Sequence, residues 1–292
     1  TGNALTTNPL SQFAATTSSV AENVAGGSHY ILVQLSNIAS ADTTVVFTSG
    51  GGGSTAANPT DYTILTASPL TITAGQTVAT ITMPIVDDSI YENDETNVLG
   101  INTPSGNVTL GSNTAHTATI TDNETAPTVQ FAAATSSAGE ATASHPVTVT
   151  LSGASASAIT VSLSVAGTGT AIGSGTDYTY GGETLTFAAG VTTQDIAIAV
   201  VDDSIDEAGE TIDLALSSPS GATLGAQNTH IHTINDNDDP PVLSIATAAA
   251  TVAEAVGTHN IIVSLDHAKS SDIVVNLTLG GTATGGGTDY TR

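Results

Sequence analysis

Apolar and polar residues alternate in short stretches along the whole chain. Residues 196–200 place Ile, Ile and Val at every second position, and residues 212–216 place Ile, Leu and Leu in the same way. The stretches 79–85 and 99–101 show the same alternation. A period of two over so few residues is typical of half-buried strands. Gly-rich and Pro-Ser-Gly turns separate the stretches, and no helical period of useful length occurs, so we expect an all-β chain.

The same landmarks return at nearly the same distance along the chain. The string Asp87-Asp88-Ser89-Ile90 returns 115 positions later (202 − 87) as Asp202-Asp203-Ser204-Ile205. Asp-Tyr-Thr occurs three times, beginning at positions 61, 177 and 289. Such a period, with about seven short strands in each copy, predicts tandem antiparallel β-sandwiches of immunoglobulin-like type. The predicted divisions are an N-terminal extension (1–9), repeat 1 (10–124), repeat 2 (127–239) and an incomplete repeat 3 (240–292).

The charge balance narrows the choice of partners. The chain has 27 acidic and 2 basic residues, a formal net charge of −25, and the two basic residues are Lys269 and Arg292. A surface of this kind repels nucleic acid and anionic membranes, whereas hard divalent cations suit clustered carboxylates. Cysteine is absent, which excludes thiolate metal sites. No apolar run approaches the roughly 20 residues of a membrane span, so we expect no membrane insertion.

The acidic residues recur at the same places in both complete repeats. They stand at the end of a first strand, in a loop before Tyr, in the paired-Asp loop between two long strands, and after the last strand. In an up-and-down sandwich these places lie at every second connection, so we expect the side chains to meet at one end. The predicted sets are Glu22, Asp61, Asp87, Asp88, Glu92, Asp122 and Glu124 in repeat 1, and Glu140, Asp177, Asp202, Asp203, Glu207, Asp236 and Asp238 in repeat 2.

Seven carboxylates at one end of a domain repel one another without a counter-ion. Ca²⁺ relieves this repulsion, because it takes six to eight oxygen ligands in irregular geometry. Mg²⁺ demands an octahedron and keeps its waters, and the scarcity of nitrogen and sulfur ligands disfavours zinc and copper. The sequence therefore predicts bound Ca²⁺, with a merely solvated acidic surface as the alternative.

The repeated string GTDYT…VVDDSIDEAGETIDLALSSPSGATLG…THIHTINDND resembles the Calx-beta domain of sodium–calcium exchangers, integrin beta-4 and many bacterial surface proteins. The resemblance covers nearly all of residues 10–239 and the first half of a third copy. It implies calcium ligands at the acidic positions named above. It adds the backbone carbonyl of Ile90 in repeat 1 and that of Ile205 in repeat 2.

Two other interpretations of polar residues are open. His230 and His232 lie two apart on the last strand of repeat 2, so they share a face; ordinary strand positions are favoured, and a transition-metal clip is the alternative. Paired aspartates also occur in glycosidases and proteases. Such enzymes raise the pKa of one carboxyl in a dry pocket, whereas these acids crowd a Gly-rich end with few aromatics, so we expect no enzyme.

The predicted function is that of a calcium-binding, extracellular structural repeat that stiffens a surface adhesin, fibre or matrix protein. We expect the protein to be secreted or held at a bacterial cell surface, with calcium ions and neighbouring repeats or copies as partners. A calcium-sensing regulatory pair and a ligand-binding adhesion module are the alternatives. The half-length repeat 3 leaves an open sheet edge, which suggests head-to-tail polymerisation, with Thr1–Pro9 as a candidate donor strand; truncation of a longer array is the simpler alternative.

Overall fold

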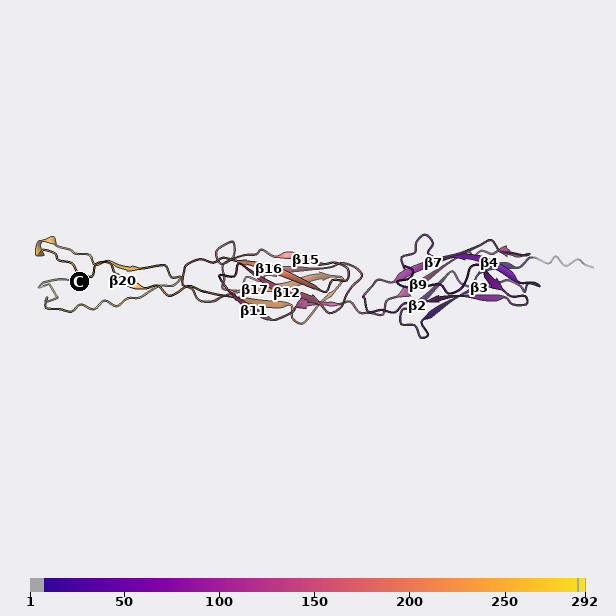
Figure 1. Ribbon diagram of the computed structural model, residues 1–292, viewed down its shortest axis with the longest axis horizontal. Helices are drawn as coiled ribbons and strands as arrows, with labels where there is room; N and C mark the ends of the chain where they lie inside the picture. Colours follow the sequence, from indigo (N-terminus) through magenta and orange to yellow (C-terminus); the bar gives the residue numbers. More distant parts are fainter. Residues whose placement is uncertain (1–7, 288, 292) are drawn as a thin grey trace, which may run out of the picture.

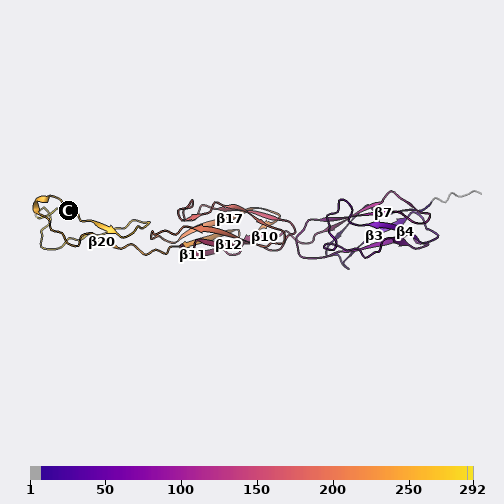
Figure 2. The ribbon, with the colours of Figure 1, turned by 45° about the horizontal axis from the view of Figure 1, so that its top comes forward.

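The computed structural model describes residues 8–287 and 289–291, so the N-terminal extension falls outside it except for Asn8 and Pro9. Three bodies follow one another along a line, and the view turned by 45° shows the same arrangement (Figures 1 and 2). Nearly all regular structure is β, and the described helical element is a single 3-10 turn, η1, Glu254–Val256. No helix among the described residues has the length and apolarity that crossing a bilayer requires.

Repeat 1 consists of two facing sheets. Their orders are β6-β3-β1-β8 and β2-β9-β7-β4-β5. The strands are β1 Leu10–Phe13, β2 Thr17–Ala21, β3 Ser28–Leu35, β4 Thr43–Thr48, β5 Leu70–Ile72, β6 Val78–Pro84, β7 Glu95–Asn102, β8 Thr109–Leu110 and β9 Ala115–Thr121.

Repeat 2 has the same construction, with one additional short strand. Its sheets are ordered β14-β16-β12-β10-β18 and β11-β19-β17-β13-β15. The strands are β10 Thr128–Phe131, β11 Thr135–Gly139, β12 Ser144–Leu151, β13 Ile159–Val165, β14 Tyr178–Thr179, β15 Glu183–Phe187, β16 Thr193–Val200, β17 Glu210–Ser220, β18 Thr223–Leu224 and β19 Thr229–Asn235.

Most neighbouring strands are antiparallel, as predicted, but the sandwich is not up-and-down. The first long segment of each repeat crosses between the sheets, at residues 14–16 in repeat 1, so β1 and β2 belong to different sheets. β1 then pairs with β8 in parallel, and β2 pairs with β9 in parallel. The expectation of an up-and-down order was therefore wrong, while the prediction of tandem immunoglobulin-like sandwiches is confirmed.

Each complete repeat has its own hydrophobic core, filled from the alternating positions of both sheets. In repeat 1 the core includes Phe13, Ile81 and Met83, all fully buried, and in repeat 2 it includes Phe131 and Ile198. Burying a side chain of this size contributes about 1.5–3 kcal/mol. The two cores have no residue in common, so each repeat holds the apolar contacts that its fold requires.

Repeat 3 is open over its described residues. β20 Leu243–Ile245 and β21 Val263–Leu265 form a two-stranded sheet. No described residue from 240 to 291 is buried, and Val274 is 87% exposed. An isolated two-stranded sheet is marginally stable in water, which agrees with the expectation that this segment does not close a two-sheet core by itself.

Candidate metal centre

Parallel pairing of the first and last strands brings two acids to one end of each repeat. β2 and β9 stop side by side, and Glu22 N–H donates to the carbonyl of Thr121 at 3.1 Å. Asp122 follows directly, so its carboxylate leaves the sheet beside that of Glu22. In repeat 2, β11 and β19 place Glu140 in the same way, with its N–H donating to the Asn235 carbonyl at 2.9 Å.

The paired-Asp loop, residues 86–94, folds back onto this end. Ile90 N–H donates to Asp88 Oδ1 at 2.7 Å, which closes a tight turn, and Glu92 N–H donates to Asp122 Oδ2 at 3.2 Å. The equivalent bonds in repeat 2 have the same lengths. The two loops share the string Val-Asp-Asp-Ser-Ile, followed by a Glu two positions later, and they fold alike.

Two groups of three carboxylates result in each repeat. Within a group, one oxygen from each side chain lies within 4.8 Å of the others. The groups are Glu22, Asp122 and Glu124; Asp61, Glu92 and Glu95; Glu140, Asp236 and Asp238; and Asp177, Glu207 and Glu210.

The structure thus brings together five of the seven predicted acids of each repeat. The remaining two, the paired aspartates, lie exposed beside the groups. Burial and the neighbouring Asp122 raise the pKa of Glu124, and the charges of Asp87 and Asp88 add to this effect. Two acids that sequence reasoning did not assign, Glu95 and Glu210, complete the second group of each repeat. The repeat pattern could have identified them, because both stand in a Glu-Thr pair and the two pairs are 115 residues apart, like the paired aspartates.

The clustered glutamates resist ionisation. Burial, followed by the charges of neighbouring acids such as Glu92 and Asp122, raises the pKa of Glu22 from its usual 4.5 to about 7. Burial and a hydrogen bond to Asp61 raise the pKa of Glu95 to about 8. In repeat 2, burial and adjacent acids likewise raise the pKa values of Glu140 and Glu210 to about 7. Since positions 1–268 contain no Lys or Arg, no basic side chain from them offsets this repulsion.

Several of these carboxylate oxygens are buried and lack a hydrogen-bond donor among the described residues. Burial of an acceptor without a partner is unfavourable, and a cation supplies what protein donors do not. A void of about 10 Å³ lies between both groups of repeat 2, a size close to that of one water molecule or ion. The oxygens concerned are Oε2 of Glu22, Glu95 and Glu124, Oδ1 of Asp236 and Oδ2 of Asp238.

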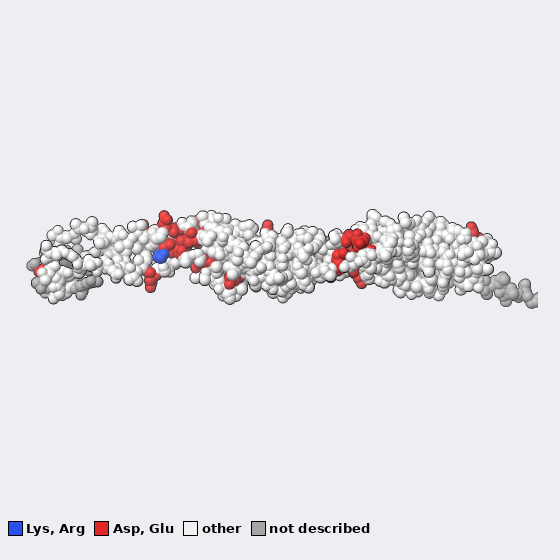
Figure 3. Space-filling model, turned by 90° about the horizontal axis from the view of Figure 1, so that it is seen from below, with Lys and Arg blue, Asp and Glu red and all other residues white. Residues whose placement is uncertain are grey.

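Figure 3 shows where this charge lies on the whole molecule: red acidic side chains gather in bands at the end of repeat 1 and at the end of repeat 2. A model of the Calx-beta domain family matches residues 6–124, 122–238 and 236–292. The chain belongs to the Calx-beta family. The three matches follow one another over nearly its full length, so the chain is an array of Calx-beta repeats.

Parts of the chain are similar to known proteins. Sodium/calcium exchanger 1 of Rattus norvegicus is 29% identical over 136 residues, which are 40% of this chain and 14% of the exchanger, and the exchanger of Canis lupus familiaris gives the same values. The chain therefore spans a small part of these relatives. Among solved structures, CBD12 from CALX1.2 is 17% identical, covering 77% of this chain and 99% of its own, with a TM-score of 0.36. The apo-form Calx CBD1 domain is 26% identical, covering 39% and 100%, with a TM-score of 0.37.

The acidic end of each Calx-beta repeat also contacts the next one. Tyr91, between Ile90 and Glu92, donates its N–H to the Ala154 carbonyl at 3.1 Å and accepts from Ala156 N–H at 3.0 Å. Tyr91 and Ser155 thus form a parallel bridge from repeat 1 to repeat 2.

Asp206, the equivalent of Tyr91 in repeat 2, forms the same kind of bridge with Lys269 of repeat 3. Its carbonyl accepts from Ser270 N–H at 3.2 Å, and its side chain is ion-paired with the Lys269 ammonium. Figure 3 shows this lysine in blue against the second acidic band. The paired-Asp loop is therefore both the acidic site and the link to the following repeat.

The histidines of the last strand form a separate, buried cluster in repeat 2. Ser136 Oγ lies 2.7 Å from both His230 Nε2 and His232 Nδ1, and His232 Nε2 lies 2.6 Å from His145 Nδ1. Among the described residues, no group of three potential metal ligands includes a histidine. Hydrogen bonds engage both ring nitrogens of His230 and of His232, whereas His145 Nε2 is buried without a partner among the described residues.

Proposed function

We propose that each complete Calx-beta repeat of this chain binds Ca²⁺ in its cluster of carboxylates. The buried oxygens without donors carry this proposal, since they recur in both repeats and offer the hard ligands that Ca²⁺ takes. The two groups of each repeat would provide room for more than one ion. The proposed ligands are the acids predicted from the sequence, with Glu95 and Glu210 added.

Asn237 adds an amide to the same site. Its NH₂ group faces the carboxylates and donates to Asp202 Oδ1 at 3.3 Å and to Glu140 Oε2 at 3.2 Å. The Ile90 and Ile205 carbonyls stay proposed ligands on the family resemblance.

We propose further that binding stiffens the array. Ile90 and Glu92 flank Tyr91, so an ion held by these neighbours fixes the residue that bridges to the next repeat. The same holds for Asp206 at the second junction. Calcium would in this way couple the order of a loop to the angle between repeats, and the array would act as a rigid, non-catalytic spacer.

A spacer of this kind suits the outside of a cell. Modular extracellular calcium sites have dissociation constants near 10⁻⁴–10⁻³ M, within the range of free calcium there. We propose an extracellular adhesin, fibre or matrix protein, of bacterial origin, as the setting. Association of the open repeat 3 with a neighbouring copy remains a proposal as well, and most of its candidate donor, Thr1–Pro9, lies outside the described residues.

Thermal unfolding of residues 1–239, which contain both cores, tests the calcium site. In EDTA followed by rising Ca²⁺, we expect a rise in melting temperature that saturates near millimolar. At a hundredfold excess over the dissociation constant, one site adds about 2.7 kcal/mol to the free energy of unfolding. Mg²⁺ at the same concentration should have a much smaller effect.

Two outcomes would count against the spacer. If Ca²⁺ produced no shift, or Mg²⁺ produced the same shift, the clusters would be solvated acidic surface. Submicromolar affinity would instead favour the calcium-sensing role. An Asp203→Asn variant should weaken the calcium response of repeat 2, whereas Asp195→Asn removes an equal charge from an exposed strand position and should leave it unchanged.

A further inference from the structure

An edge of repeat 2, and the same edge of repeat 3, contact the paired-Asp loop of the preceding repeat. In repeat 2 this edge is the turn that follows β12, and two of its backbone groups hydrogen-bond to Tyr91. In repeat 2 these groups are the Ala154 carbonyl and the Ala156 amide. In repeat 3 the amide of Ser270 contacts the Asp206 carbonyl. Both junctions therefore use one kind of contact.

Repeat 1 carries the same edge, at Ile38–Ser40. Gly75 N–H donates to the Ala39 carbonyl at 3.0 Å, as Gly190 N–H donates to the Ser155 carbonyl at 2.9 Å, so Ala39 corresponds to Ser155.

The entry of the chain into the two repeats corresponds as well. The Pro9 carbonyl accepts from Thr109 N–H at 3.0 Å, and the Pro127 carbonyl accepts from Thr223 N–H at 2.9 Å. An incoming repeat would thus approach repeat 1 along the same path that repeat 1 follows toward repeat 2.

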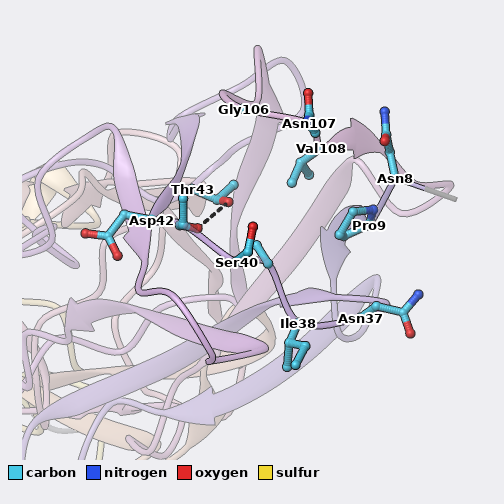
Figure 4. A pocket seen from close by; sticks show the side chains of 12 residues that line it. Asn8, Pro9, Asn37, Ile38, Ser40, Asp42, Thr43, Gly106, Asn107 and Val108 are labelled. Atoms are coloured by element: carbon cyan, nitrogen blue, oxygen red, sulfur yellow. Dashed lines mark hydrogen bonds between the residues drawn. The ribbon is translucent and has the colours of Figure 1, made fainter. Parts of the chain in front are cut away.

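This edge of repeat 1 is open among the described residues. The Ile38 carbonyl and the Ser40 amide, which correspond to the gripping groups of repeat 2, have no hydrogen-bond partner there. The Ile38 side chain is 67% exposed. A surface hollow of about 640 Å³ lies at this end, as Figure 4 shows. Its lining comes from Asn8 and Pro9, the turn 37–43 and the turn 106–108.

We propose that the Ile38–Ser40 edge is a docking surface for the paired-Asp loop of a further Calx-beta repeat, joined ahead of repeat 1. Continuity with the two existing junctions argues for this partner, because the same turn already holds such a loop twice, through both backbone groups in repeat 2 and through the Ser270 amide in repeat 3. A second copy of these 292 residues has no free loop to offer, since the loops of repeats 1 and 2 are both engaged by the repeat that follows.

The charge of the residue at the centre of each edge matches that of the residue that it contacts. Lys269 stands at the centre of the repeat 3 edge and receives the acidic Asp206, whereas Ser155 stands at the centre of the repeat 2 edge and receives the uncharged Tyr91. Ala39 is small and uncharged, like Ser155. The incoming loop should therefore carry an uncharged residue at the Tyr91 position, because a carboxylate there would be desolvated without a cation.

Hydrogen exchange of the Ser40 amide tests the proposal in an extended chain. Residues 1–126 are placed ahead of residues 9–292, so that an added copy of repeat 1 precedes the original one through its own linker. In millimolar calcium, Ser40 in the unextended chain should exchange freely. In the extended chain, Ser40 of the original repeat should exchange about tenfold more slowly, as expected for one new backbone hydrogen bond.

A charge swap supplies the matched variants. Tyr91→Asp in the added copy should remove the protection of Ser40, and Ala39→Lys in the original repeat should restore it by reproducing the Asp206–Lys269 pair. Asn93→Ala in the added copy, two residues away, should leave the protection unchanged.

Three results would overturn the proposal: slow exchange of Ser40 in the unextended chain, free exchange in the extended one, or equal protection when residues 1–124 are added as a separate molecule. The last result would make the partner a free repeat in place of a joined one.

Discussion

Replacing Glu140 by Gln should stabilise repeat 2 without calcium and reduce the stabilisation that calcium adds. Glu140 is 4% exposed, and burial together with adjacent acids raises its pKa from 4.5 to about 7. Glutamine keeps the shape and removes the charge. A single substitution that stabilises the calcium-free repeat and weakens its response to calcium separates repulsion among carboxylates from ligation of an ion.

The magnitude follows from the two pKa values. The difference between 7 and 4.5, at about 1.36 kcal/mol for each pKa unit, gives an upper limit of about 3.4 kcal/mol for the cost of ionising Glu140. Water reaches this end of the sandwich and neighbouring side chains relax, so we expect about 1–2 kcal/mol. For a domain of this size, each kcal/mol shifts the melting temperature by about 4–8 °C, so we expect a rise of about 4–16 °C.

The pH dependence fixes the sign. Because the pKa of Glu140 is raised in the folded state, folded repeat 2 holds a proton between about pH 4.5 and 7 that the unfolded chain has lost. The wild-type protein therefore loses stability as the pH rises through this window, and the variant loses less, because Glu210, with its pKa raised to about 7, still titrates there. The difference between them should be largest near pH 8 and small below about pH 4.5.

Calorimetry of residues 1–239 in EDTA and in calcium measures both effects. In calcium, the variant should lose affinity by about tenfold, as expected when about 1.4 kcal/mol of ligation is removed. Asp195→Asn is the control, because it removes the same charge from an exposed strand position. The reasoning would be refuted if Glu140→Gln were less stable than the wild type in EDTA at pH 8, or bound calcium equally well.

Three further predictions concern the junction, the histidine cluster and the core. Lys269→Ala leaves the Asp206 carboxylate, 7% exposed, without its cation, so the second junction should lose about 1–3 kcal/mol. Hydrogen exchange of the Ser270 amide should then be faster, and unchanged exchange would contradict the role of the pair. Burial lowers the pKa of His232 from 6.5 to about 4, so its contribution to the stability of repeat 2 is present above pH 6.5 and is lost as the pH falls toward 4. When the free energy of unfolding is measured with urea in calcium across this pH range, His232→Ala should show a weaker pH dependence than the wild type, and an equal pH dependence would disprove the role of His232. Ile198→Val should destabilise repeat 2 by about 0.5–1.5 kcal/mol and leave the repeat 1 transition in place, because the cores are separate, whereas a shift of both transitions would show that the repeats unfold together.

The sequence was most informative where side-chain alternation and repeated landmarks coincide. Ile196 and Ile198 alternate into the core as predicted, and the acidic positions meet at one end of each repeat. The crossing of the first segment between sheets could not be predicted. Residues 14–16 and 132–134 contain no Gly or Pro, so the sequence of this segment is that of one continuous strand.

The partners of buried polar residues were the other feature that the sequence did not predict. Asn97 interrupts the alternation of its strand, and the structure shows it fully buried, with its carbonyl oxygen accepting from Gly50 N–H at 2.9 Å and its amide donating to Ser49 Oγ at 2.9 Å. The partners lie almost 50 residues away, beyond any local pattern. The bridges between repeats are equally non-local, since Tyr91 and Asp206 contact turns that differ in sequence from one junction to the other.

The parallel pairing of β2 with β9 has a mechanical consequence. These strands lie near the two ends of repeat 1 in the chain, and the chain enters and leaves the repeat at opposite ends of the rod. A pulling force along the rod therefore loads the five paired positions from Thr17–Ala21 with 117–121 in shear, all at once, and does not unzip them one by one. The same pairing recurs in repeat 2 between β11 and β19. Under tension, each repeat should resist extension most strongly at the strands that end in its acidic cluster.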